Sequence, residues 1–181
     1  GVVGAILRDQ PALDGILDGL RVLEYRGYDS AGVAVALPEG VAVRRRAGRI
    51  EALQEALDDG ALGAARCGVG HTRWATHGEP NQINAHPHKS GNGSLAIIHN
   101  GIIENYGALK TELTEKGYEF RSDTDTEVFI TFIEDIKKSL DLSLEDAVRV
   151  ALTKVVGAYA IVIMSVEEPD KLIAARKGSP M

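Results

Sequence analysis

The sequence has very little cysteine and no long apolar run. Its single cysteine, Cys67, excludes an internal disulfide framework and is typical of proteins in a reducing compartment. We therefore expect a cytoplasmic location. No apolar stretch approaches the roughly 20 residues that a bilayer-spanning helix needs, so we expect no membrane partner.

An excess of positive charge is also lacking. The formal net charge of −6 argues against a surface that binds nucleic acid or anionic membranes. The one basic run, Arg44-Arg45-Arg46, is short, and we expect it at the solvated end of a strand. A length of 181 residues suits one domain, or most of one, with a sizeable core.

The apolar patterns predict short strands and amphipathic helices. Strands are expected at residues 2–7, 33–37, 41–43, 67–73, 94–99, 158–164 and 172–175. Helices are expected at 12–25, 50–57, 107–116, after 122–127 and at 143–155. Paired strands with helices grouped between them indicate an α+β class with antiparallel sheets and helical layers. Because the chain stops directly after a strand, we expect a domain that is truncated at its C-terminus.

One polar stretch, residues 71–105, contains all five histidines and the only tryptophan. The histidines raise the possibility of a metal site, because His77, His86 and His88 lie close in sequence and zinc can be held by three histidines. No carboxylate stands at a short ligand spacing, however, and there is no H-E-x-x-H or paired-cysteine pattern. We expect neither a metal nor a cofactor, and a structural role fits His86 better.

A second possibility is a cleft for a small zwitterion. Arg73 offers a planar fork that matches a carboxylate, and Asp125 offers a negative charge for an ammonium group. Thr76 and His77 could hold the remainder. Structural roles for the same residues stay open, since an arginine beside Trp74 often stacks on it at the surface and the run 123–127 also suits a helix start.

The sequence also contains a pair of groups that can donate hydrogen bonds to one oxygen. Asn100-Gly101 is expected at the end of a strand, where a side-chain amide and a backbone N–H can point at one oxygen, as in an oxyanion hole. An Asn-Gly pair is equally common in a turn. Cys67 is a third possibility, as a nucleophile, but it stands in an apolar strand of small residues, where inert buried cysteines occur. The chain therefore offers a binding cleft without a convincing nucleophile.

Taken together, these motifs resemble the glutaminase domain, a class II glutamine amidotransferase domain, of the glutamine–fructose-6-phosphate amidotransferases (glucosamine-6-phosphate synthases). The resemblance covers the whole chain, and its motifs follow the family's order. They are residues 24–32, 71–78, 84–88, 99–105 and 123–127. The family's fold is the N-terminal-nucleophile hydrolase fold, a four-layer sandwich of two antiparallel sheets between helices, which agrees with the expected order of elements.

The resemblance implies a mechanism through an N-terminal cysteine. The family opens with Cys-Gly-hydrophobic-Val-Gly, and the segment Gly1 to Gly4 matches everything after the cysteine. We therefore expect the nucleophile immediately before Gly1, and we expect the chain as given, residues 1–181, to be inactive without it. A terminal thiol beside its own α-amino group, with a pKa of about 7.7–8.0, would need no histidine as general base.

The resemblance also implies residue roles. Asn100 and the Gly101 N–H would form the oxyanion hole, Arg73 would hold the α-carboxylate of glutamine, and Asp125 would hold its α-amino group. The supporting residues are Thr76 and His77 in the same pocket, Trp74 as a gate to an ammonia path, and Arg26 as a brace near the nucleophile.

The implied reaction is hydrolysis of L-glutamine to L-glutamate and ammonia through a cysteine thioester. In the family the ammonia passes to a C-terminal sugar isomerase domain, absent from this sequence, that converts fructose 6-phosphate to glucosamine 6-phosphate. The full-length enzyme is expected to be a homo-oligomer. The alternative hypothesis is a glutamine-binding or regulatory module without catalysis.

Overall fold

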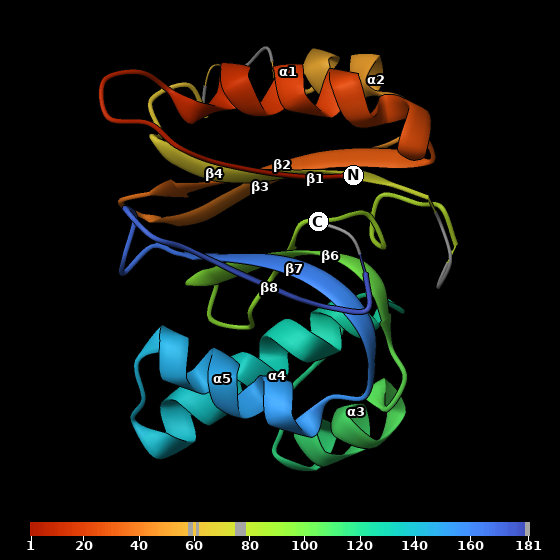
Figure 1. The fold of residues 1–181 in the computed structure, drawn as a ribbon, viewed down its shortest axis with the longest axis vertical. Helices are drawn as coiled ribbons and strands as arrows, with labels where there is room; N and C mark the ends of the chain where they lie inside the picture. The colour runs from red at the N-terminus through yellow and green to blue at the C-terminus, as the bar shows by residue number, and fades with distance from the viewer. Residues whose placement is uncertain (58–59, 61, 75–78, 180–181) are drawn as a thin grey trace.

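The structure is a computed structural model that describes residues 1–57, 60, 62–74 and 79–179. Two antiparallel sheets stack face to face, with helices on both outer sides (Figure 1). This arrangement confirms the predicted α+β class and the four-layer sandwich. No helix in the described part of the chain is long and apolar enough to cross a membrane.

The first sheet contains four strands in the order β1-β4-β2-β3. Their bounds are β1 (Val2–Ile6), β2 (Ser30–Leu37), β3 (Gly40–Ala47) and β4 (Cys67–Arg73). The outer face is covered by α1 (Ala12–Leu23), which continues into a 3-10 turn, η1 (Glu24–Arg26), and by α2 (Ile50–Glu55) (Figure 1). The apolar residues at helical spacing on α1 are buried against this sheet, namely Ala12, Ile16, Leu17 and Leu20.

The second sheet has the order β5-β6-β7-β8. Its strands are β5 (His88–Lys89), β6 (Leu95–Ile103), β7 (Gly157–Ser165) and β8 (Leu172–Lys177). Its outer face is covered by α3 (Tyr106–Glu115), α4 (Asp125–Leu140) and α5 (Leu144–Lys154) (Figure 1). Thr124 caps α4 by accepting from the N–H of Glu127, and Ser143 caps α5 by accepting from the N–H of Asp146.

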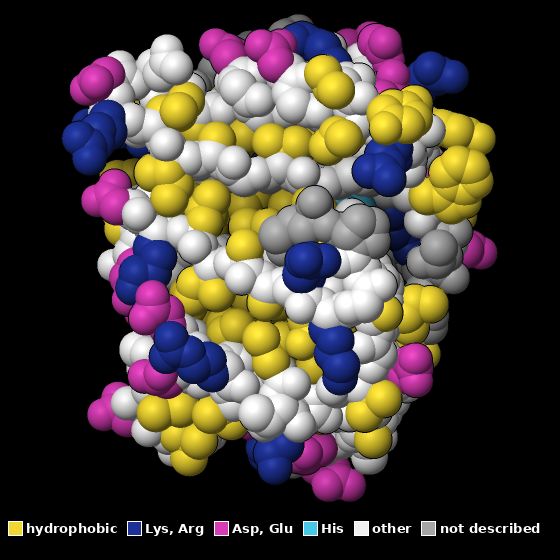
Figure 2. Space-filling model, viewed as in Figure 1, with side chains coloured by type: hydrophobic (Ala, Val, Ile, Leu, Met, Phe, Trp, Pro, Cys, Tyr) yellow, Lys and Arg dark blue, Asp and Glu magenta, His cyan; other side chains and the backbone are white. Residues whose placement is uncertain are grey.

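Apolar side chains form three layers of core, one on each outer sheet face and one between the sheets. The middle layer is made of small and medium residues: Ala34, Val41, Cys67, Val69, Ala96, Ile98, Val162 and Met164. In the space-filling view, hydrophobic side chains gather in bands at the levels of the sheets, and a small patch of histidine is visible between the two sheet layers (Figure 2). The sandwich is therefore apolar along most of its midplane but polar in one region.

Two local predictions were wrong. Strand β6 does not end at His99 but runs to Ile103, so Asn100 and Gly101 lie within the strand, paired with Ala160 and Tyr159 of β7. The Arg45 side chain is half-buried rather than solvated, because it donates to the carbonyl oxygen of Ala85 at 3.0 Å. That bond helps to hold the segment before β5 against β3.

Close packing of α1 on β4 depends on a glycine. A Cβ at Gly70 would lie 2.4 Å from Ile16 Cγ2 and 3.0 Å from Leu20 Cδ1. We expect Gly70→Ala to lower the free energy of unfolding by about 1–3 kcal/mol through overpacking. The matched control is Gly15→Ala on the exposed face of α1, where a Cβ meets nothing within 4 Å.

The control should raise stability by about 0.5–1 kcal/mol, because alanine favours the helix over glycine. Urea unfolding followed by circular dichroism measures both changes. Equal stability of the Gly70→Ala variant and the parent would contradict the packing described here.

Candidate functional site

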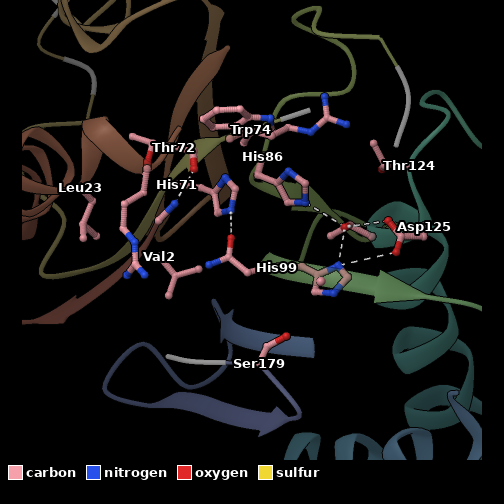
Figure 3. A pocket seen from close by; sticks show the side chains of 16 residues that line it. Val2, Leu23, His71, Thr72, Trp74, His86, His99, Thr124, Asp125 and Ser179 are labelled. Atoms are coloured by element: carbon pink, nitrogen blue, oxygen red, sulfur yellow. Dashed lines mark hydrogen bonds and ion pairs between the residues drawn. The ribbon is translucent and has the colours of Figure 1, made fainter. Parts of the chain in front are cut away.

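A cavity of about 440 Å³ lies between the two sheets, and residues from both halves of the sandwich line it (Figure 3). Six residues predicted from the sequence lie on its wall: Arg26, Arg73, Trp74, Asn100, Gly101 and Asp125. The predicted residues Thr76 and His77 lie outside the described residues. The structure thus brings together side chains from η1, β4, β6 and α4.

The amide of Asn100 is oriented by a buried histidine. The Nε2 atom of His71 lies 2.8 Å from Asn100 Oδ1, and His71 is 2 % exposed (Figure 3). Burial lowers the pKa of His71 to about 3. The ring is therefore neutral and donates its Nε2–H to Oδ1, which leaves the Nδ2 group of Asn100 as the donor.

Gly101 has a backbone conformation that only glycine adopts easily. Its φ of +121° lies outside the strand region, and a Cβ at this position would lie 2.0 Å from the carbonyl oxygen of Ala158. The peptide at Asn100–Gly101 therefore departs from the regular pleat while the pairing with β7 continues. The Asn-Gly pair serves a strand on the cavity wall and not a turn.

Asp125 is the first residue of α4 and is 4 % exposed. Its Oδ2 accepts from the N–H of Ile103 at 2.7 Å, which joins the start of α4 to the end of β6. The positive end of the helix dipole also favours a carboxylate at this position. The run 123–127 is thus both a helix start and part of the cavity, so the two hypotheses for it are compatible.

Opposite charge is supplied by Arg73 at the end of β4. The side chain is buried, and its Nη1 donates to the carbonyl oxygen of Glu79 at 3.3 Å. Burial lowers the pKa of Arg73, while the negative charges of Asp125 and Asp29 raise it. The cavity therefore presents a guanidinium and a carboxylate to the same space.

Trp74 follows Arg73 and is 59 % exposed, with its ring centroid 5.6 Å from that of Tyr28. Arg73 itself is 5 % exposed and lines the cavity, so it does not form the surface stack on Trp74 that was the alternative.

The first residues of the chain also reach the cavity. Gly1 N donates to the carbonyl oxygen of Thr72 at 2.6 Å, and Thr72 N donates to the carbonyl oxygen of Gly1 at 3.0 Å. The pairing of β1 with β4 therefore extends one residue before Val2, to Gly1. Cys67, at the other end of β4, does not line the cavity, and burial raises the pKa of its thiol to about 11.

Four histidines are buried near the cavity: His71, His86 and His99 line it, and His88 packs against His86. Burial is the main cause that lowers the pKa of each ring, to about 3 for His71 and His88. His88 Nε2 lies 3.0 Å from the hydroxyl of Thr124, and the His86 ring stands between those of His71 and His88. Among the described residues, no group of His, Cys, Asp or Glu is arranged to hold a metal ion.

Several cavity residues were not predicted from the sequence. They are Gly1, Val2, Leu23, His71, Thr72, His86, His99, Thr124, Thr126 and Ser179. For His71 and His99 there was a signal, since each is a polar residue inside an apolar strand. For Thr126 and Ser179 there was none, because a threonine in a first helical turn and a serine after a strand are ordinary.

Comparison with known proteins adds to this geometry. Residues 50–178 match the family of glutamine amidotransferase domains. The chain is 50% identical over all of its length to a glutamine–fructose-6-phosphate aminotransferase (isomerizing) of Thermococcus kodakarensis, and it spans 30% of that protein. It is 51% identical to the protein of the same name from Chlorobaculum tepidum, again spanning 30% of its length.

Solved structures agree. A glutamine phosphoribosylpyrophosphate amidotransferase from B. subtilis superimposes with a TM-score of 0.77 and is 29% identical, over 97% of this chain and 37% of the other. The chain therefore has the fold of the N-terminal-nucleophile amidotransferases.

The buried histidines make stability depend on pH. Their pKa values are depressed in the folded protein, to about 3 for His71 and His88, against about 6.5 in an unfolded chain. Between these values the unfolded state binds more protons, so stability rises with pH and falls as the pH drops below about 6.5. We expect a loss of about 1.4 kcal/mol per pH unit for each such histidine.

Urea unfolding at pH 7.0, 6.0, 5.5 and 5.0 measures this slope. The variant His88→Gln should reduce the slope of the free energy of unfolding against pH by the contribution of one histidine proton. This reduction is expected whatever the variant's stability at pH 7. A free energy of unfolding that stays constant between pH 6 and pH 5 would show that the imidazoles titrate normally.

Proposed function

Because this chain belongs to the family of glutamine amidotransferase domains, we propose that it hydrolyses L-glutamine to L-glutamate and ammonia. The observation that carries the proposal is the cavity itself, which is lined by Arg73, Asp125, the Asn100–Gly101 pair and Gly1. A zwitterionic amino acid needs one positive and one negative partner, and a reacting amide needs donors for its developing oxyanion.

The proposed roles follow from charge and donor geometry. The guanidinium of Arg73 binds the α-carboxylate, and Asp125 binds the α-ammonium group. Asn100 Nδ2 and the Gly101 N–H donate to the oxygen of the side-chain amide, and His71 holds Asn100 in the orientation that this requires. We propose that Thr76 and His77, which lie outside the described residues, also contribute to substrate binding, and that Arg26, which lines the cavity, braces the region near Gly1.

We place the nucleophile on the residue that precedes Gly1, as a cysteine. The register of β1 on β4 pairs Val2 with His71, and Gly1 continues it opposite Thr72. The next position back would therefore lie opposite Arg73, at the cavity that Asn100 and Gly101 line from the other sheet. A free α-amino group on that cysteine, with a pKa of about 7.7–8.0, serves as general base for its own thiol.

The proposed reaction has two steps. The thiolate attacks the amide carbon of glutamine, the oxyanion is held by Asn100 and Gly101, and the amide nitrogen takes up a proton and leaves as ammonia. The resulting thioester is then attacked by water, which gives glutamate and restores the thiol. In both steps the donor pair stabilises charge that exists only in the transition state.

The chain spans about 30% of the length of the curated relatives it matches. By analogy with their names, we propose that the ammonia passes to a C-terminal sugar isomerase domain and converts fructose 6-phosphate to glucosamine 6-phosphate. The exposed Trp74, whose ring lies at a tilt against that of Tyr28, is proposed to gate that passage. A module that binds glutamine without cleaving it is the alternative function.

The first test is ammonia release by the full-length protein with its native N-terminus. Asn100→Ala should lower kcat about 10²–10³-fold, because it removes an oxyanion donor, with little change in KM. The control is Asn92→Ala, which alters an amide that bonds Ser90 and Ser94 in the turn before β6. Glutamine binding without ammonia release in the unmodified protein would instead favour the binding module.

A second test concerns Arg73. We expect Arg73→Ala to raise KM for glutamine about 30- to 150-fold, equivalent to about 2–3 kcal/mol for a charged, bidentate contact. Arg73→Lys should be intermediate, since it keeps the charge but loses the planar fork. Arg149→Ala on α5, which pairs with Asp146 on the outer helical layer, is the control. An unchanged KM for Arg73→Ala would remove this residue from the proposed site.

A further inference from the structure

The hydroxyl of Thr126 stands at the centre of a buried network. His86 Nε2 lies 2.8 Å from Thr126 Oγ1, and His99 Nδ1 lies 2.9 Å from the same atom (Figure 3). The hydroxyl also reaches Asp125 Oδ1 at 3.4 Å. Thr126 is 0 % exposed, so water does not replace any of these partners.

Counting protons assigns the direction of every bond. A hydroxyl has one proton to donate and two lone pairs that accept, and a neutral imidazole has one N–H and one bare nitrogen. A carboxylate can only accept. If the Thr126 proton goes to Asp125, both imidazoles must donate to Oγ1, from Nε2 of His86 and from Nδ1 of His99.

The remaining ring nitrogens agree with this assignment. His86 Nδ1 and His99 Nε2 are buried and have no hydrogen-bond partner among the described residues. In the assigned tautomers both are bare acceptors. If Thr126 donated instead to either histidine, that ring would bury an N–H without an acceptor and Asp125 Oδ1 would lose its donor, which is the costlier arrangement.

We propose that Thr126 is a positioning residue for Asp125 and, through it, for the ammonium group of the substrate. The two imidazoles, one on β6 and one on the segment before β5, fix the hydroxyl so that its single proton points at Oδ1. The N–H of Ile103 holds Oδ2. The carboxylate is thus held through both oxygens, and its orientation is set by residues from two other segments of the fold. This inference rests on the proposed role of Asp125.

The kinetic test uses three variants of the full-length protein. Thr126→Val keeps the shape but removes the hydroxyl, and we expect it to raise KM for glutamine about tenfold with kcat within about threefold. Thr126→Ser keeps the hydroxyl and should stay within about twofold of the parent. Asp125→Asn removes the charge itself and should raise KM further.

Inhibition by product analogues separates positioning from a general structural role. L-glutamate carries the α-ammonium group and glutarate does not. Thr126→Val should weaken inhibition by L-glutamate about tenfold and leave inhibition by glutarate unchanged. Equal weakening of both, or a KM that does not move, would overturn the role of Thr126.

Two failures can be told apart. If Asp125→Asn leaves KM unchanged, the proposed ammonium site is wrong. If Asp125→Asn raises KM and Thr126→Val does not, only the positioning role is wrong. Should Thr126→Val fail to fold, solid-state NMR of the parent protein labelled with ¹⁵N-histidine decides the question. The proposal requires that His99 be the Nδ1–H tautomer, and its signal is assigned by its loss in the variant His99→Gln. An Nε2–H form of His99 overturns the proposal.

Discussion

Face-to-face packing of the two sheets is the constraint on which the rest of the structure depends. The middle core layer brings β4 and β6 together, although they are separate in sequence and belong to different sheets. Their polar ends, His71 to Arg73 on β4 and His99 to Gly101 on β6, then meet at the cavity. A shift of either strand by one residue would reverse the direction of every one of these side chains.

Burial gives the cavity its electrostatic character. Four imidazoles enclosed between the sheets are held neutral, so they act as fixed hydrogen-bond donors and not as proton carriers. This separates the arrangement from a Cys–His or Ser–His pair, in which the histidine must gain and lose a proton. It is compatible with a reaction whose base is an α-amino group.

Much of the fold could be predicted because the signals were local. Helical spacing marked α1, α4 and α5, and Ser143 marked the start of α5 correctly. The polar stretch 71–105 contains half of the residues that line the cavity, since histidine, arginine and asparagine rarely interrupt buried strands without a reason. Where prediction was wrong, at the end of β6 and at Arg45, the deciding partner was distant: β7 continues the pairing past Gly101, and the carbonyl of Ala85 withdraws Arg45 from solvent.

The sequence alone determined the class of fold, the charged residues Arg73 and Asp125 and the order of elements except the two-residue strand β5, because hydrophobic periodicity and residue chemistry are properties of short segments. Only the tertiary structure decided which way the groups face. The bond between His71 and Asn100 spans 29 positions in the chain, and that between His86 and Thr126 spans 40. Such contacts depend on how two sheets and a helix terminus meet, and that geometry leaves no periodic pattern in the sequence.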